Sequence, residues 1–213
     1  QNLLANKLGR EEAVASFGFN PEKKTVLILG GSLGARTINQ TLIAALDTIK
    51  AHSDIQFIWQ TGKIYIQQIK DAITTATGEA VRNPRIPAIP NLYVTDFIKD
   101  MASAYAAADL VISRAGAGSI SEFCLLQKPV ILVPSPNVAE DHQTKNALAL
   151  VNKEAAIYVK DVDAMEQLVP VALETVADDK KLKVLSENIA TLALPDSATI
   201  IAKEVLKLID NDK

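Results

Sequence analysis

One stretch decides the fold of this 213-residue chain: Thr25-Val26-Leu27-Ile28-Leu29-Gly30-Gly31-Ser32-Leu33-Gly34-Ala35. Its first five residues form a mostly apolar run, which is typical of a strand that is buried on both faces of a parallel sheet. Beyond the glycines, Ile38, Leu42, Leu46 and Ile49 recur at helical spacing. A strand, a glycine-rich turn and a helix in this order predict the start of a βαβ unit.

The same alternation of short apolar runs and helical stretches continues along the chain. Five more runs are candidate strands: Ile55–Trp59, Leu92–Val94, Leu110–Ile112, Val130–Val133 and Ala156–Val159. Because parallel strands need crossover connections, the pattern predicts a doubly wound α/β fold, a Rossmann-like parallel sheet with helices on both faces. No shift in composition marks a boundary, so we expect a single domain over residues 1–213.

Local signals predict how the remaining segments fold. Arg10–Phe17 predicts a short leading helix closed by Gly18, since glycine suits the left-handed residue after a helix. Asp196 or Ser197 can begin a last helix. The apolar positions of that helix would be Ile201, Val205, Leu208 and Ile209. Gly78–Asn91 contains three prolines and predicts an irregular loop.

Composition and charge exclude several classes of protein. With 48% hydrophobic and 22% charged residues, the chain is an ordinary globular sequence rather than a disordered or fibrous one. Its net charge of −3, without a Lys/Arg cluster, makes a nucleic-acid partner unexpected. The single Cys124 lies in an apolar run, which predicts a buried thiol in a reducing, cytoplasmic compartment. No apolar run reaches the roughly 18 residues of a transmembrane segment, so any membrane association would be peripheral.

The glycine-rich turn Gly30–Ala35 is a candidate phosphate site. Glycines let the backbone approach a ligand, and the following helix N-terminus offers free N–H groups, to which Ser32 adds a hydroxyl. A tight turn without a ligand explains the segment equally well. Two sharper templates do not fit, because no Gly-Lys-Ser/Thr stands in the P-loop position and Asp47 lies on the helix rather than after a second strand.

A second strand, small-residue turn and helix start occupy Asp109–Glu122. Two such turns in one sheet suit a diphosphate-bearing ligand that lies across the carboxyl ends of the strands. Ser119 and Glu122 have the spacing of a capping box, so they could simply satisfy helix amides. Alternatively, the backbone of Ala117–Ser121 approaches the ligand and Glu122 accepts hydrogen bonds from a ribose diol. Both interpretations stay open from the sequence.

Two further segments carry polar or apolar groups suited to a ligand. In the loop Pro134–Ala147, His142, Gln143 and Asn146 offer donors and acceptors for sugar hydroxyls, although a surface helix start explains them almost as well. Phe97-Ile98 could present an apolar wall and backbone groups to a base, or could be core. Two histidines and one cysteine form no metal-ligand pattern, so we expect no metal, and no nucleophile elbow supports a serine hydrolase.

Taken together, these segments resemble the MurG family, glycosyltransferases that move N-acetylglucosamine from UDP-GlcNAc to a lipid-linked muramoyl-pentapeptide. The matching motifs follow in order along nearly the whole chain: Arg10-Glu11-Glu12-Ala13, Phe17-Gly18, Gly30–Ala35, Gln60-Thr61-Gly62-Lys63, Phe97-Ile98-x-x-Met101, Ala108–Arg114 and Asp141–Ala147. The ordered set is specific, whereas any one motif is not. The resemblance implies one half of a GT-B fold, the C-terminal, donor-binding half, with the N-terminal acceptor domain absent from this chain.

The resemblance also implies a UDP-GlcNAc site and the residues that form it. Ser32, next to Gly31, would meet the diphosphate, Ile98 would hold uracil through its backbone, Glu122 would bind the ribose hydroxyls and Gln143 would contact the GlcNAc. The loop under ribose and phosphate would comprise Ala117, Gly118, Ser119, Ile120 and Ser121. Weaker candidates are Met101, His142 and Asn146. Gly118 and Ser119 stand where many members have Leu and Thr, which keeps the hydroxyl but thins the apolar cover.

The implied reaction is an inverting displacement that converts lipid I to lipid II at the inner face of the cell membrane. The acceptor would bind through the absent N-terminal domain, so we expect no catalytic residue here, and binding without turnover. No cofactor is expected besides the donor substrate. Two alternatives stay open, a UDP-GlcNAc 2-epimerase-like enzyme with the same fold and a non-catalytic nucleotide-binding module.

Overall fold

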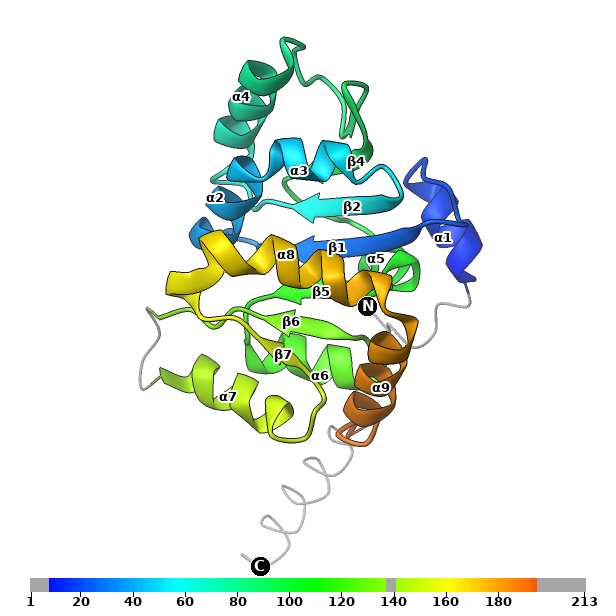
Figure 1. Cartoon of the computed structure of the whole chain (residues 1–213), viewed down its shortest axis with the longest axis vertical. Helices are drawn as coiled ribbons and strands as arrows, with labels where there is room; N and C mark the ends of the chain where they lie inside the picture. The colour runs from blue at the N-terminus through cyan, green and yellow to red at the C-terminus, as the bar shows by residue number, and fades with distance from the viewer. Residues whose placement is uncertain (1–7, 137–140, 195–213) are drawn as a thin grey trace, which may run out of the picture.

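The computed structural model describes residues 8–136 and 141–194, and these contain one seven-stranded sheet (Figure 1). The strands are β1 (Lys24–Leu29), β2 (Ile55–Gln60), β3 (Arg85–Ile86), β4 (Ile89–Thr95), β5 (Leu110–Ser113), β6 (Val130–Leu132) and β7 (Ile157–Tyr158). Their order across the sheet is β3-β4-β2-β1-β5-β6-β7. Neighbouring strands are parallel except for β3, which pairs antiparallel with β4. The predicted Rossmann-like fold is confirmed.

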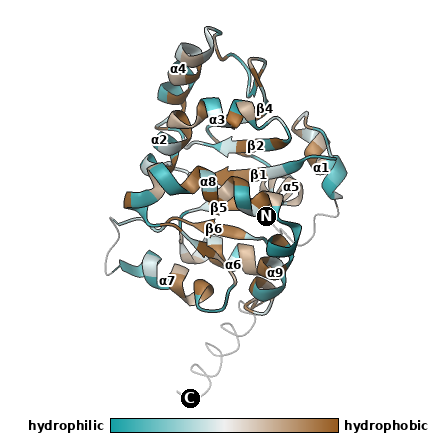
Figure 2. Ribbon diagram, viewed as in Figure 1, coloured by the Kyte–Doolittle hydropathy of each residue, from teal (hydrophilic) through white to brown (hydrophobic). Residues whose placement is uncertain are grey.

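Helices cover both faces of this sheet. The helices of the described residues are α1 (Arg10–Ser16), α2 (Arg36–Ala44), α3 (Leu46–Ala51), α4 (Ile66–Thr77), α5 (Met101–Ala107), α6 (Ala117–Leu125), α7 (His142–Val151), the 3-10 turn η3 (Asp161–Asp163), α8 (Ala164–Ala177) and α9 (Asp179–Ala190). Successive side chains of β1 point to opposite faces. Val26 and Ile28 pack with α2, α3, α4 and α8, whereas Leu27 and Leu29 pack with α1, α5, α6, α7 and α9. The strands are accordingly mostly apolar, although β2 also contains Gln56 and Gln60 (Figure 2).

The strand order reverses at β1. From β1 the chain first builds outward through β2 and β4, and then returns to place β5 on the other side of β1 before continuing to β6 and β7. Ligands of open α/β sheets bind outside the carboxyl ends of the strands at such a reversal. The fold therefore directs attention to the crevice beyond Leu29 of β1 and Ser113 of β5, which are paired in register.

Three local predictions need comment. The helix expected from Ile38 to Ile49 is two helices, because the chain breaks at Ala45 between α2 and α3. The irregular loop predicted for Gly78–Asn91 is wrong in part, since it contains β3 and the start of β4. Prolines conceal this edge hairpin, because they are tolerated on edge strands but signal loops in a sequence. The last helix predicted after Asp196 lies outside the described residues.

The predictions for the leading helix and for Cys124 are confirmed. The leading helix α1 ends at Ser16 and is followed by Gly18 with a left-handed φ of +72°. Cys124 is buried in the core beside Phe123. No helix within residues 8–136 and 141–194 has both the length and the apolarity needed to cross a bilayer.

Candidate functional site

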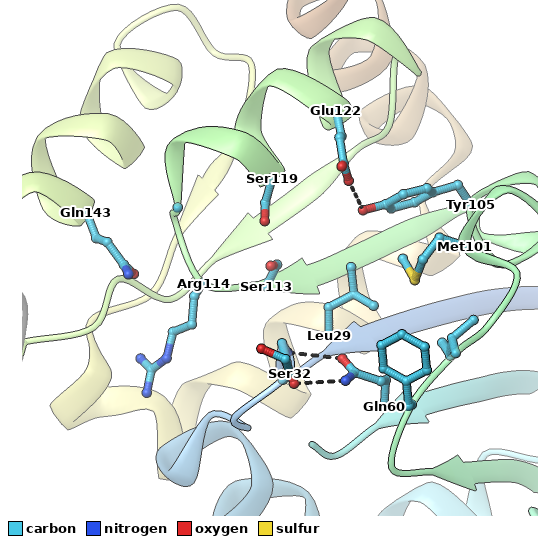
Figure 3. A pocket seen from close by; sticks show the side chains of 15 residues that line it. Leu29, Ser32, Gln60, Met101, Tyr105, Ser113, Arg114, Ser119, Glu122 and Gln143 are labelled. Atoms are coloured by element: carbon cyan, nitrogen blue, oxygen red, sulfur yellow. Dashed lines mark hydrogen bonds between the residues drawn. The ribbon is translucent and has the colours of Figure 1, made fainter. Parts of the chain in front are cut away.

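A cavity of about 260 Å³ occupies the crevice at the strand reversal. The ends of three neighbouring strands form its floor, through Leu29, Gln60 and Ser113. The turns after β1, β4 and β5 and the helices α5, α6 and α7 form its walls (Figure 3). The wall residues are Gly30, Gly31, Ser32, Phe97, Ile98, Met101, Tyr105, Arg114, Gly116, Ser119, Glu122 and Gln143. Residues up to 114 positions apart in the chain thus meet at one edge of the sheet.

The glycine-rich turn is held to the sheet by the buried side chain of Gln60. The Gly31 N–H donates to Oε1 of Gln60 at 3.0 Å, and Nε2 of Gln60 donates to the Gly31 carbonyl at 2.8 Å and to the Asp96 carbonyl at 3.1 Å. One amide group therefore connects the turn after β1, through the bonds that Figure 3 marks, with the turn after β4. Because the Gly31 N–H is already bonded, Ser32 is the residue of this turn that offers polar groups to the cavity, which it lines.

Close backbone packing explains why the same turn needs glycine further on. Gly34 and Gly62 both have left-handed backbones, with φ of +87° and +80°. A Cβ on Gly62 would lie 2.3 Å from the Gly34 nitrogen, and one on Gly34 would lie 2.7 Å from the Thr61 carbonyl oxygen. Neither position has room for a side chain, so these glycines set the path of the loop into α2.

Helix α6 brings Ser119 and Glu122 to the cavity one turn apart. The helix begins at Ala117 with Gly116 as its N-cap, and no side chain caps it. Ser119 is thus the third residue of the helix rather than its cap, and the capping-box interpretation is wrong. The backbone of Gly116, which is extended, starts the helix three residues earlier than the Ser-x-x-Glu spacing predicts.

The other residues predicted for this loop do not line the cavity. Ala117 and Gly118 are exposed at the start of α6. Ile120 and Ser121 face a different hollow, between α6, α7 and the segment after α9. The helical repeat separates them from Ser119 and Glu122, which lie on the cavity side.

Glu122 is oriented by a tyrosine. Oη of Tyr105 donates a 2.8 Å hydrogen bond to Oε2 of Glu122, from α5 to α6 (Figure 3). Tyr105 is only 2% exposed and its ring lies edge-on to Phe123. Burial, followed by the hydrogen bond and negative charge of Glu122, raises the pKa of Tyr105 far above its ordinary value, so the phenol stays a donor.

Arg114 lines the cavity but is engaged by neighbouring groups. Its Nη1 forms an ion pair with Asp161 and donates to the carbonyls of Val133 at 3.0 Å and Pro134 at 3.2 Å. Asp161 in turn accepts a 2.8 Å hydrogen bond from Thr37 of α2. This network ties the ends of β5 and β6 to η3 and α2, and the partnered guanidinium contributes little net charge to the cavity.

Gln143 connects two loops at the far end of the cavity. Its Oε1 accepts from the N–H of Ser135 at 2.9 Å and of Ala115 at 3.2 Å, which leaves the side-chain NH₂ as the group that can donate to a ligand. Asn146 donates to the Ala115 carbonyl at 3.2 Å and does not line the cavity. His142 is exposed and also lies outside the cavity lining.

The turn between β4 and α5 forms the apolar wall. Ile98 is 6% exposed, Phe97 is 50% exposed, and both line the cavity with Met101 at the start of α5. Asp100 caps this helix, since its Oδ1 accepts from the Ser103 N–H at 3.1 Å. The wall thus combines an anchored residue, Ile98, with the partly free ring of Phe97.

Tyr105, Gln60 and Ser113 are site residues that the sequence did not single out. Tyr105 follows Met101 by four residues, and this spacing places both on one helix face, so the signal was present in the sequence. Gln60 could have been identified from its place at the end of a buried strand, because a buried polar residue requires a hydrogen-bond partner. Buried Ser113 ends β5 in the same way.

The arrangement suits a ligand that is anionic in the middle and apolar at one end. The turn that leads into α2 and Gly116, the N-cap of α6, line the crevice, and helix N-termini favour phosphate groups. A carboxylate that can accept hydrogen bonds lies to one side and an apolar wall to the other. Within the described residues, no three His, Cys, Asp or Glu side chains lie close enough together to hold a metal ion.

Comparison with known families agrees with this geometry. Residues 25–201 match the model of the glycosyltransferase family 28 C-terminal domain. The chain belongs to this family. The match begins in β1 and so includes both turns that end at the cavity and all the residues that line it.

The curated relatives of this chain share one name. The chain is 74% identical over 208 residues to a Bacteroides fragilis protein named UDP-N-acetylglucosamine--N-acetylmuramyl-(pentapeptide) pyrophosphoryl-undecaprenol N-acetylglucosamine transferase, covering 98% of this chain and 52% of that protein. The chain thus spans about half the length of the curated relatives it matches. The crystal structure of Acinetobacter baumannii MurG superposes with a TM-score of 0.74 at 27% identity, over 96% of this chain and 55% of that chain.

A third likeness concerns the fold alone. A putative UDP-N-acetylglucosamine 2-epimerase from Listeria monocytogenes has a TM-score of 0.63 at 9% identity, over 97% of this chain and 50% of that chain. Epimerase and transferase halves therefore share this sheet, and the fold by itself does not distinguish them.

Proposed function

We propose that this domain binds UDP-GlcNAc, as the donor half of an inverting N-acetylglucosaminyltransferase. The observation that carries the proposal is the cavity at the strand reversal, where the glycine-rich turn before α2, the N-terminus of α6 and the oriented Glu122 carboxylate meet. The name of the Bacteroides fragilis relative, 74% identical, supports the same substrate.

In this proposal each wall of the cavity recognises one part of the donor. Ser32, in the turn before α2, and the N-terminus of α6 bind the diphosphate, whose negative charge grows as UDP leaves. Glu122 accepts hydrogen bonds from the ribose hydroxyls, and the backbone of Ile98 holds uracil, with Phe97 beside it. The NH₂ group of Gln143 donates to the sugar.

The remaining candidates act through position. Gly31 permits the turn, Ser119 faces the cavity from the same side as Glu122, and Met101 adds apolar wall. Ala117 and Gly118 take part through the α6 N-terminus, whereas Ile120, Ser121, His142 and Asn146 contact no ligand directly in this pose. Stabilisation by helix N-termini needs neither a metal nor a cofactor.

The whole enzyme would transfer GlcNAc to the lipid-linked muramoyl-pentapeptide, converting lipid I to lipid II. An acceptor hydroxyl attacks the anomeric carbon from the face opposite UDP, the bond to the diphosphate oxygen breaks, and the configuration inverts. The acceptor and the base belong to the other half of the cleft. The enzyme would act at the cytoplasmic face of the membrane as a peripheral protein.

Calorimetric and thermal-shift titrations of this chain test the donor proposal, because a ligand that binds only the folded state raises the melting temperature. UDP and UDP-GlcNAc are expected to stabilise the chain, whereas ADP-glucose and NAD are not. Equal responses to all four compounds would contradict uridine specificity. A chain that responds to none of them would contradict donor binding by this half.

A different measurement distinguishes a 2-epimerase from a glycosyltransferase. A 2-epimerase converts UDP-GlcNAc to its 2-epimer without any acceptor, which proton NMR detects at the anomeric position. We expect a protein that contains both halves to leave UDP-GlcNAc unchanged until the acceptor is added. Accumulation of the 2-epimer without acceptor would favour the epimerase.

A further inference from the structure

A second hollow, of about 290 Å³, lies at the opposite end of the sheet from the donor crevice. Lys23 precedes β1, Lys50 lies in the last turn of α3 and Arg85 begins β3, and all three line this hollow with Phe19, Ser53 and Asn91. It opens at the amino ends of β1 and β2, so it shares no lining residue with the donor crevice.

The charged side chains that line this hollow are all positive. Three cationic side chains line it, and no Asp or Glu of the described residues does. None of the ion pairs found in residues 8–136 and 141–194 includes Lys23, Lys50 or Arg85. The Lys23 ammonium is fixed at the wall, since it donates a 2.7 Å hydrogen bond to the Ser53 carbonyl.

Arg85 carries the strongest sign that a partner is missing. Its guanidinium lies over the Phe19 ring, 4.5 Å from the centroid. Its Nη1 is buried and has no hydrogen-bond partner in the described part of the chain. Burial lowers the pKa of Arg85, and no carboxylate offsets this effect. Buried donors are nearly always bonded, so the orphaned Nη1 marks a guanidinium whose hydrogen-bonding capacity the described residues do not use up.

We propose that this hollow is an anion-binding site that takes a phosphate group. The planar guanidinium can donate two parallel hydrogen bonds to phosphate oxygens, and the two lysines add point charges beside it. Phe19 holds the guanidinium from one face. The phosphate could belong to a soluble phosphate compound or to an anionic lipid headgroup, since both present the same oxygens.

Phosphate titration followed by NMR tests the site independently of donor binding. The ¹⁵N-labelled chain, saturated with UDP, is titrated with inorganic phosphate at constant ionic strength. We expect amide shifts at Phe19, Ser53 and Asn91, with those at Gly31 and Ser32 unchanged. Shifts confined to Gly31 and Ser32, or absent everywhere, would overturn the proposal whether or not UDP binds.

Matched variants give the test its control. Arg85→Gln is expected to raise the phosphate Kd at least tenfold, and Lys50→Gln, at an exposed residue that should not affect folding, at least threefold. Arg82→Gln removes the same charge three residues away, outside the hollow, and is expected to change the Kd less than twofold. Equal Kd values for the Lys50 and Arg82 variants would overturn the site.

Vesicle flotation then distinguishes the two sources of phosphate. If phosphatidylglycerol vesicles, but not phosphatidylcholine vesicles, carry the chain and Arg85→Gln abolishes this, the site takes a headgroup. If the vesicles do not carry the chain while phosphate binding depends on Arg85, the site takes a soluble phosphate compound. If the Arg85→Gln variant floats with the vesicles as the original chain does, and also binds phosphate equally well, the hollow binds neither a headgroup nor a soluble phosphate compound.

Discussion

Tyr105 donates a 2.8 Å hydrogen bond to Oε2 of Glu122 and thereby joins α5 to α6 beside the cavity at the strand reversal. The bond uses one carboxylate oxygen and leaves the other for a ligand. Because burial raises the pKa of Tyr105, the phenol remains protonated and the orientation of Glu122 does not vary near neutral pH. Tyr105 thus positions the Glu122 carboxylate, which we propose binds the ribose.

Replacing Glu122 with Gln should weaken UDP binding by about 1–3 kcal/mol, the contribution of a charge-assisted hydrogen bond. Since no side chain caps α6, the melting temperature should not fall with it. Calorimetry with UDP and 3′-deoxy-UDP measures the effect, and the variant should discriminate less between the two. A loss of stability as large as the loss of affinity would contradict a ligand role for Glu122.

The Tyr105→Phe variant keeps the buried ring and deletes only Oη. UDP binding should weaken by about 0.5–1.5 kcal/mol, because the Glu122 carboxylate loses its orienting donor. A double-mutant cycle with Glu122→Ala checks the cause. If Tyr105 acts through Glu122, its deletion should cost little in the Glu122→Ala background, whereas equal costs in both backgrounds would show that it acts separately.

Gly34→Ala and Gly31→Ala form a matched pair. Both glycines have left-handed φ angles, +87° and +75°, but a Cβ on Gly34 would lie 2.3 Å from Tyr65, whereas Gly31 has open space. Gly31→Ala should therefore cost about 1–2 kcal/mol of backbone strain, and Gly34→Ala clearly more. Urea unfolding measures both. Equal losses would show that the packing against Tyr65 and Thr61 does not constrain the turn.

Asp100 predicts a pH dependence of stability. Hydrogen bonds from the Ser103 side chain and then its backbone lower the pKa of Asp100 below the ordinary 3.8. The unfolded chain therefore binds the proton more readily, so this contribution is complete above about pH 4 and is lost as the pH falls through the folded pKa. The effect is small, because the carboxylate is exposed.

The Asp100→Asn variant isolates this titration, since Asn keeps a capping oxygen but not the charge. Its urea midpoint should be below that of the original chain at neutral pH, and the two should converge as the pH falls below the lowered pKa of Asp100. A difference that stays constant with pH would show that the charge of Asp100 plays no part.

Much of the proposed donor site could be predicted because its parts are local. The apolar run of β1, the glycines after it and the start of α2 are consecutive residues, and so are β5 and α6. Parallel strands place their carboxyl ends at one edge, so Ser32, Ile98 and Glu122 were expected together, and all three line the cavity. Ile120 and Ser121 fall outside it, since contact with a ligand depends on where the helix axis points.

The sequence by itself determined the strands β1, β2, β4, β5, β6 and β7, the alternation of helices and the two turns, since periodicity and glycine placement act on neighbouring residues. Only the tertiary structure decided which distant side chains meet. The short strand β3 exists through its pairing with β4, and Tyr105 reaches Glu122 only because α5 and α6 lie on the same face. Such contacts depend on strand order and helix packing, which no local stretch of residues records.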